Sequence, residues 1–588
     1  MHMSPTKRTF PTWEELYGRR PKFDEIKEVL SQLNRLQTVL LLSQVSIHLA
    51  LDRFHNDSKH SANLQGFLIS NLIPDDLLDR LKKRYPLERL EVRTCFHRWQ
   101  VLTLLKWALV ECPATGGADP DKDQEAKYNL GRSLVMTNDL LMTQGGTEAI
   151  SRSRVSEKRR MIALQLQLGS TFELNNPPSI EASLVRTDMM FGEVARKVSP
   201  PLDVKAVFAA RTGLQLDTYV DMVFGLLTYY LTQSQKELIE DPGKVLFNPE
   251  TFFRIVPGED VRRFLSMELG TIDETGSHLR QPSALKPQHD FIAFRKKPLL
   301  QLGQMSAICI NPGFLQEKVE SGLFWSIFNS LATKKERDLL FQTWGMLFEE
   351  YVSWLLAEPL QGKAERYIPF PKFTDNDDEA FDGVVVSEDK LFVMEYKGGF
   401  LKAEAKYAEN ENELIDDLRL KFGTDPRAGV GQLARKIGQV FNAKDSQRRK
   451  LRDVDSSTAT LIVPVMVVQE PFVSSHITSI YLRGEFRSAL RLQDVSKRVL
   501  CTGLQILDVG EIEGLRPYLR SGQCTFGDCL MGWARLGDKA VPFHEYFAAY
   551  FREKRLTAIS DSEIATRARK ILDRISTRFF GHPLTQAD

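Results

Sequence analysis

Two short apolar segments with charged residues at their ends constrain the fold of this chain more than any other feature. They lie in Glu379–Gly399, which reads EAFDGVVVSEDKLFVMEYKGG. The polar stretch Ser387–Lys390 predicts a turn between two β-strands, and both faces of the second strand begin apolar, which is typical of a strand covered on both sides. Charged side chains rarely lie in such strands without a partner. The charges of Asp382, Glu395 and Lys397 therefore need a physical explanation.

The spacing of these three residues brings them together. Residues two apart share a face of a strand, so Glu395 and Lys397 lie side by side, and the predicted turn brings Asp382 to their level. Two clustered carboxylates repel each other and are costly to bury, and a divalent cation such as Mg²⁺, which prefers oxygen ligands, would remove that conflict. The alternative is a surface salt bridge at a strand end. Glu-x-Lys alone is uninformative, because it recurs elsewhere in the chain without a preceding apolar strand.

The wider pattern predicts an α+β protein with several domains. Leucine-rich spacing of three and four over residues 1–280 predicts a large, mostly helical region, and 281–333 reads as a connecting segment. The order helix, strand, hairpin, helix, strand, helix, strand over 334–525 predicts an α/β domain with helices on both faces of its sheet. Residues 526–588 predict a helical C-terminal extension. Beside the hairpin, strands are expected within 364–370, 458–469 and 498–509.

Composition excludes some classes of protein. The 588-residue chain has a net charge of +1, so any contact with nucleic acid needs a local basic patch. The apolar stretch Thr38–Leu51 is interrupted by Gln44 and His48 and is too short to span a bilayer, so it predicts a buried helix and no membrane partner. Six scattered cysteines form no zinc-ligand set, and with no signal peptide at the start we expect reduced thiols and a cytoplasmic location.

The pattern Asp382-(x)12-Glu395-x-Lys397, with a helix before it and α/β elements after it, resembles the PD-(D/E)XK nuclease superfamily, which has the restriction-endonuclease-like fold. Phe381 stands where the family usually has proline. The resemblance covers about a third of the chain. It implies metal-dependent hydrolysis of a phosphodiester bond. Asp382, Glu395 and the backbone carbonyl of Tyr396 would bind Mg²⁺ or Mn²⁺, and Lys397 would orient water or stabilise the phosphate.

Two helices extend the resemblance. Many family members carry a glutamate in a Gly-x-x-Phe-Glu pattern before the sheet, and this chain has GMLFEEYV from Gly345. The helical wheel puts Glu349 on the side of Gly345 and Glu350 on the opposite flank, so Glu349 is the expected further metal ligand and catalytic residue.

The predicted helix Gly429–Phe441 resembles the family helix that follows the Glu-x-Lys strand and carries Gln-x-x-x-Tyr. Gln432 is the expected site residue of this helix. Lys436 replaces the tyrosine and shares a face with Gln432. It would contact a phosphate, or it is an exposed helix lysine.

Further contacts with nucleic acid are expected from the stretch KDSQRRKLRD, which begins at Lys444. Its basic side chains would bind backbone phosphates, or the stretch is a solvated loop. The candidates are Lys444, Arg448, Arg449, Lys450 and Arg452. A second basic run at 151–160 is either a phosphate contact or a solvated helix start. The acidic stretch 403–417 would repel DNA, so it should lie away from the substrate groove or gate it.

These features predict a metal-dependent DNA endonuclease of restriction or anti-phage defence. Its helical N-terminal region would regulate it by binding a protein partner or a second copy of the chain. The alternatives are a nuclease for RNA or for branched or single-stranded DNA, and a helical scaffold with a degenerate nuclease domain. The intact set of Asp382, Glu395 and Lys397 argues against the scaffold.

Overall fold

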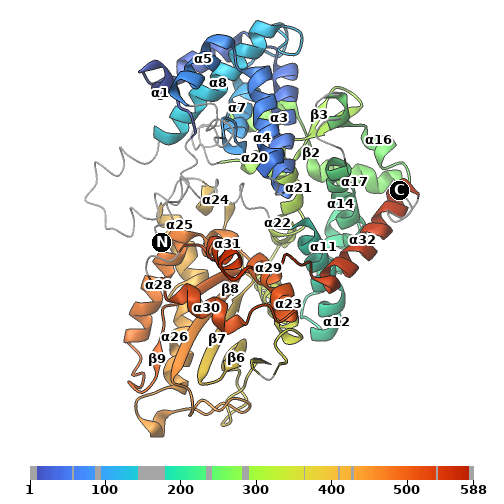
Figure 1. The fold of residues 1–588 in the computed structure, drawn as a ribbon. Coiled ribbons are helices and arrows are strands. Elements are labelled where there is room, and N and C mark those ends of the chain that lie inside the picture. The colour runs from blue at the N-terminus through green and yellow to red at the C-terminus, as the bar shows by residue number, and fades with distance from the viewer. Residues whose placement is uncertain are drawn as a thin grey trace.

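The computed structural model describes residues 10–55, 58–85, 94–143, 179–232, 242–280, 290–362, 364–407, 411–424, 429–537 and 541–581 (Figure 1). It is an α+β structure in which helices predominate and two small mixed sheets form. The basic run predicted at 151–160 lies outside the described residues.

The first part of the chain is helical, as its leucine spacing predicts. The stretch Thr38–Leu51 falls in α3, where its apolar side chains are buried. Within the described part of the chain, no helix is long and apolar enough to cross a membrane. The helices are α1 (Trp13–Tyr17), α2 (Phe23–Ser31), α3 (Arg35–His55), α4 (Ser58–Leu72), α5 (Asp75–Arg84), α7 (Arg98–Glu111), α8 (Gln124–Thr143), α11 (Ile180–Met189) with the π-helical turn η1 (Met190–Val194), α12 (Ala195–Val198), α13 (Val204–Thr212) and α14 (Leu216–Thr232).

A four-stranded sheet follows, in the order β1-β4-β3-β2. Two of its strands come from the region predicted as helical and two from the segment predicted as a connection. The strands are β1 (Leu246–Phe247), β2 (Leu269–Thr271), β3 (Leu299–Leu302) and β4 (Ser306–Cys309). Helical elements surround them: η2 (Pro242–Val245), α16 (Pro249–Phe252), α17 (Gly258–Glu268), α18 (Ile272–Leu279), α20 (Ile292–Lys296), α21 (Pro312–Glu317) and α22 (Ser321–Ser330). The strands β3 and β4 fall within 291–310, whose short apolar pieces predict strands. The strands β1 and β2, of two and three residues, leave too little alternation to be recognised in a sequence.

The second sheet contains the predicted hairpin and has the order β10-β8-β7-β6-β5, with β9 paired to β8. Strand β7 is antiparallel to β6 and parallel to β8. The strands are β5 (Arg366–Pro369), β6 (Gly383–Ser387), β7 (Lys390–Lys397), β8 (Leu461–Val468), β9 (Leu500–Cys501) and β10 (Gln505–Asp508). The last predicted strand is therefore two short strands, because residues 502–504 interrupt it.

Helices cover both faces of this sheet, and alternate side chains of β7 pack against a different set of helices on each face. Phe392, Met394 and Tyr396 belong to the large apolar cluster that also contains the core of the helical region. Leu391 and Val393 belong to a second cluster on the other face. The first face packs against α23 (Lys334–Ala357), α29 (Val509–Arg520) and α30 (Phe526–Ala534), and the second against α25 (Glu411–Phe422), α26 (Gly429–Val440) and α28 (His476–Arg491). Short elements complete the domain: α24 (Ala403–Tyr407), η3 (Asp445–Gln447) and α27 (Pro471–Ser474).

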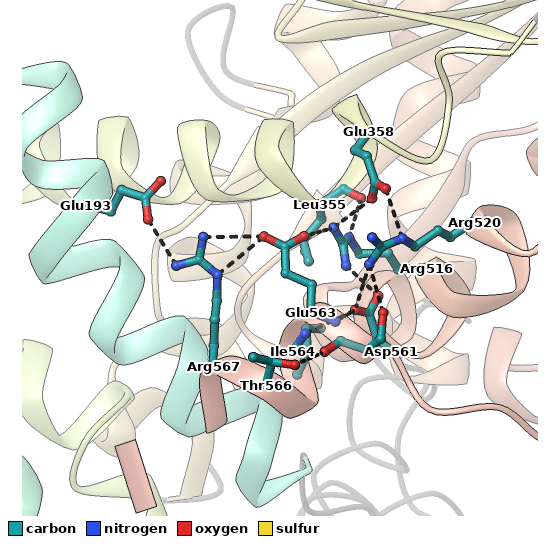
Figure 2. A network of polar contacts seen from close by, with 11 residues as sticks. Glu193, Leu355, Glu358, Arg516, Arg520, Asp561, Glu563, Ile564, Thr566 and Arg567 are labelled. Carbon is teal, nitrogen blue, oxygen red and sulfur yellow. Dashed lines mark hydrogen bonds and ion pairs between the residues drawn. The ribbon is translucent and has the colours of Figure 1, made fainter. Parts of the chain in front are cut away.

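The last helices are α31 (Phe543–Lys554), which packs against α29 and α30, and α32 (Ser562–Phe580), which connects the two parts of the molecule (Figure 1). Two arginines of α32, Arg574 and Arg578, each lie 2.8 Å from a carboxylate oxygen of the buried Asp221 in α14. At its other end, Asp561 and Glu563 bind Arg516 of α29 (Figure 2). The C-terminal helix thus holds the sheet domain and the helical region against each other.

Candidate active site

The register of the hairpin places the two predicted carboxylates next to each other. Gly383 of β6 pairs with Met394 of β7, so Asp382 reaches the level of Glu395 at the end of the strand pair. The Asp382 carboxylate accepts a hydrogen bond of 2.5 Å from the backbone N–H of Tyr396. Both carboxylates are buried, Asp382 with 4% and Glu395 with 0% of its surface exposed. The strand that carries Glu395 therefore also orients Asp382.

Glu395 lies between two lysines. Its Oε1 is 2.6 Å from Nζ of Lys397, and its Oε2 is 3.9 Å from Nζ of Lys436. The close contact with Lys397 is charge-assisted and occupies Oε1, whereas Oε2 accepts no hydrogen bond within the described residues. A buried carboxylate normally has its lone pairs occupied. Glu395 instead keeps acceptor positions that a cation can fill.

The helix α26 supplies the second layer of the site. Gln432 accepts a hydrogen bond of 3.4 Å from the Lys397 ammonium through Oε1. Lys436, one turn later, is 8% exposed and faces Glu395. The interpretation of Lys436 as an exposed helix lysine is therefore wrong, because the same helix face that carries Gln432 packs onto β7.

The helix α23 approaches the end of β7 closely enough to bring Glu349 to the site. A Cβ at Gly398 would lie 2.8 Å from the Cβ of Phe348, so only glycine permits this packing. The negative charge of Asp382 and the positive charge of Lys397 both act on Glu349. Glu350 points elsewhere and pairs with Lys197 of α12. The structure thus places Glu349, rather than Glu350, beside the carboxylates.

The acidic groups of the site share one electrostatic environment. Burial raises the pKa of Asp382 to about 6, against the opposing effect of Lys397. Burial and then the charge of Asp382 raise the pKa of Glu395. The same two causes, in the same order, raise the pKa of Glu349 to about 9. Desolvation and mutual repulsion thus both oppose the charge of these carboxyls.

Lys397 responds in the opposite way. Burial alone would lower the pKa of its ammonium, but the charges of Glu395 and Asp382 outweigh burial and raise it. The side chain is 21% exposed, so it lies where the buried site meets solvent. A lysine with a raised pKa stays protonated at neutral pH and serves as a hydrogen-bond donor and a positive charge, not as a base.

The oxygen atoms of the site match part of the ligand set that one hard cation requires. In the described residues, no group of three or more histidine, cysteine, aspartate or glutamate side chains is gathered closely enough to hold a metal. The fit rests on fewer groups: Oε2 of Glu395, which accepts no hydrogen bond within the described residues, and the adjacent carboxylate of Asp382. Carboxylates with water and phosphate as the remaining ligands suit Mg²⁺. Ligation by Glu349 and by the Tyr396 carbonyl stays a prediction.

Compared with protein-family models, with curated proteins and with solved structures, the chain matches none. The functional argument rests on its own residues.

One acidic residue near the site was missed in the sequence. Glu379, exposed and three residues before Asp382, adds its charge to the field that raises the pKa of Glu349 and of Asp382. Its position is set by a bridge between its backbone and that of Lys372. The signal was present in the quoted segment, but an acidic residue outside the strand offered no alternation to place it.

The basic stretch that begins at Lys444 is only partly available to bind phosphate. Arg449 pairs with Asp375 at 2.6 Å and lies 3.6 Å from the ring centroid of Phe373. Arg452 pairs with Asp377 of the same acidic turn. A phosphate would have to compete with this turn for both arginines.

The other basic residues of this stretch differ in their surroundings. Arg448 pairs with Asp445 at 2.6 Å, while Lys444 and Lys450 are exposed. The role of all five predicted nucleic-acid ligands of this stretch, Arg449 and Arg452 included, stays a prediction. In the acidic stretch 403–417, Asp417 is buried and pairs with Lys421 at 2.9 Å, so part of the repulsive charge is already neutralised.

Proposed function

We propose that this chain is a metal-dependent phosphodiester hydrolase that acts on nucleic acid, with its active site at Asp382, Glu395 and Lys397. One observation carries the proposal. Glu395 is completely buried and lies beside a second buried carboxylate, and its Oε2 accepts no hydrogen bond within the described residues. Such an arrangement is unfavourable in a structural role and suits a cation site.

The side chains have distinct tasks in this proposal. Bound Mg²⁺ or Mn²⁺ would lower the pKa of a coordinated water and offset charge on the phosphate. Asp382 is held in place by the Tyr396 N–H, so its carboxylate needs little reorganisation. The Lys397 ammonium has three donors. Two of them face Glu395 and Gln432, and the third can bind a phosphate oxygen or the attacking water.

Lys436 supplies a second positive charge on the other side of Glu395. Together the two lysines oppose the effect of burial on the pKa of Glu395, and they offset the negative charge that an approaching phosphate adds. Glu349 would complete the site, directly or through water. The mixed sheet with its hairpin between two helical layers agrees with the resemblance to PD-(D/E)XK nucleases.

Regulation by the helical region is part of the proposal and is supported by buried contacts with α23. Tyr351, two residues after Glu349, donates a hydrogen bond of 2.8 Å to Glu513. Glu513 in turn accepts bonds of 2.9 and 3.0 Å from Arg186 of α11. A movement of α11 would therefore act on the helix that carries Glu349. DNA as the substrate and a role in restriction or anti-phage defence remain inferences from the resemblance.

The proposal is tested by incubating the purified full-length chain with supercoiled plasmid, linear duplex DNA, single-stranded DNA and RNA, in Mg²⁺, Mn²⁺ or EDTA. We expect cleavage that requires metal and is lost in Asp382→Asn and Lys397→Ala. The matched controls are Asp389→Asn and Lys390→Ala, the same residue types at the opposite end of the hairpin. Metal-dependent cleavage that survives both site variants would overturn the assignment.

A further inference from the structure

A pocket of about 470 Å³ separates the helical region from the end of strand β7. One wall comes from α20, α21 and α22 and includes Arg295, Lys296 and Trp325. The other wall comes from the segment 401–407, which follows β7, and from Glu470, which follows β8. The pocket is of the size that proteins use for small ligands. None of the predicted site residues lines it.

The pocket lies close to the candidate active site. Its wall residue Leu401 follows Lys397 by four residues, which limits their Cα separation to about 15 Å. Glu470 follows the end of β8, where Val468 pairs with Lys397. Both connections leave the sheet at the edge that carries the active site. A nucleic-acid strand bound at the site would reach the pocket within a few nucleotides.

The lining combines aromatic rings with positive charge. Trp325, Phe328 and Tyr407 supply the rings. Lys296 and Lys402 are exposed at the rim and form no ion pair with any part of the chain that the structure describes.

Deeper charges in the pocket are already paired. Lys406 lies 3.0 Å from Glu470, and Arg295 pairs with Glu317. The guanidinium of Arg295 also lies 4.6 Å from the centroid of the Tyr407 ring, which fixes that ring in the wall. Against the single exposed carboxylate of the lining, Glu404, the two rim lysines leave a net positive charge for a ligand. Trp325 is a half-buried ring of the same pocket, with the Lys421 ammonium 5.5 Å from its centroid.

We propose that this pocket binds a nucleotide, with the base against Trp325 and a phosphate near Lys296 and Lys402. Aromatic side chains bind bases by stacking regardless of sequence, and lysines bind the phosphate charge. The volume admits one nucleotide and excludes a base pair with its backbones. The inference rests on the proposed function in one point: the nucleotide belongs to the substrate strand. That strand must then be unpaired next to the cleavage site. A free nucleotide has the same chemistry and is the other source.

The test measures binding separately from cleavage. Full-length Asp382→Asn protein in EDTA is titrated into labelled single-stranded DNA, labelled duplex DNA of the same sequence, and AMP, with fluorescence anisotropy for the DNAs and calorimetry for AMP. Trp325→Ala should weaken single-strand binding about tenfold, as the loss of one stacking platform does, and leave duplex binding unchanged. Trp325→Phe should restore most of the affinity.

A second variant keeps the test valid if Trp325→Ala does not fold. Lys402→Ala changes an exposed side chain and should weaken single-strand binding several-fold and reduce its salt dependence by about one counterion. The control Lys122→Ala removes an exposed lysine of the helical region that does not line the pocket and should change nothing.

The outcomes separate the two sources. If the pocket variants weaken single-strand binding, the ligand is the substrate strand; if they weaken AMP binding alone, the ligand is a free nucleotide. Unchanged binding of all three probes in Lys402→Ala and in folded Trp325 variants would overturn the proposal. The binding test uses no metal, so its result does not depend on cleavage. A chain that binds single-stranded DNA through the pocket but never cleaves in the metal-containing assay would refute the proposed function and leave the pocket assignment intact.

Discussion

Two buried clusters in this molecule each combine carboxylates with basic side chains and differ in how completely their contacts are satisfied. Around Arg516, every contact is made: the guanidinium binds Asp561, Glu563 at 2.7 Å and Glu358 at 3.1 Å, and its Nε donates to the Leu355 carbonyl (Figure 2). Around Glu395, Lys397 lies 2.6 Å from one carboxylate oxygen, while the other oxygen is 3.9 Å from Lys436 and accepts no hydrogen bond within the described residues.

The difference teaches how to distinguish a structural charge cluster from a candidate site. A buried charge is tolerated when its partners satisfy it, and the Arg516 cluster meets that condition. The cluster at Glu395 keeps unused acceptors, raised carboxyl pKa values and an opening to solvent at Lys397. The first joins elements of the fold, whereas the second is arranged for a ligand.

The strongest way to test this comparison is to remove Arg516. Arg516→Ala would take from the buried Asp561 its closest ion-pair partner and leave Arg520 at 3.7 Å, so we expect the free energy of unfolding to fall by about 3–5 kcal/mol. Urea denaturation measures it. Arg516→Lys should recover part of the loss. A loss below about 1 kcal/mol would show that the cluster is not a structural one.

At the candidate site, the expected effect is on activity. Lys397→Ala should lower kcat by about 10²–10³-fold, because a positioned donor to the phosphate is lost. The free energy of unfolding should change little, since Lys436 still faces Glu395. Single-turnover cleavage assays and urea denaturation of the same variant measure the two quantities. A variant that unfolds easily but cleaves normally would reverse the roles of the two clusters.

Metal binding should stabilise only one cluster. With Mg²⁺ at about 100 times its Kd, the free energy of unfolding should rise by about 2.7 kcal/mol over that in EDTA. Asp382→Asn should remove this gain, and Arg516→Lys should keep it. Thermal melts with and without the ion give the answer without any nuclease substrate. An equal gain in wild type and Asp382→Asn would place the ion elsewhere.

The pH dependence of stability gives a smaller effect with a definite sign. The pKa of Asp382 is raised from its ordinary 3.8 to about 6 in the folded chain. Between these values the folded state binds more protons than the unfolded state, so stability falls as pH rises from about 4 to 6. Asp382→Asn should flatten this part of the curve in EDTA. A stability that rises over the same window in wild type but not in the variant would contradict the assignment.

The smallest effect is expected at the solvent side of the Arg516 cluster. Arg567 joins Glu563 to Glu193 of η1 at 3.0 Å, and all three side chains are partly exposed (Figure 2). Arg567→Ala should lower the free energy of unfolding by less than about 1 kcal/mol. A larger loss by urea denaturation would mean that this surface pair carries the contact between α32 and the helical region.

Much of the candidate site was predictable because its geometry is local. The alternation of β7 and the length of the turn place Asp382 beside Glu395, and the helical wheel separates Glu349 from Glu350. Lys436 was not predictable, since an exposed and a buried lysine look alike in sequence. Its burial depends on α26 packing against β7, an event between distant segments.

The basic stretch after Lys444 failed to reveal its partners for the same reason. Its positive charge was visible, but the pairing of Arg449 and Arg452 with Asp375 and Asp377 joins residues more than seventy positions apart. The pocket between α22 and the end of β7 is likewise formed by walls that no local pattern connects. Sequence periodicity carries no information about contacts between such distant segments.

By itself, the sequence determined the elements and the chemistry that each can carry: a hairpin covered on both faces, a helix with Glu349 on one flank, and a helix with Gln432 and Lys436 on one face. Periodicity suffices for this because each element repeats over a few residues. Only the tertiary structure decided which charges are satisfied. Arg516 forms ion pairs with carboxylates, whereas an oxygen of Glu395 accepts no hydrogen bond within the described residues. Burial and ion pairing both depend on segments brought together from across the chain.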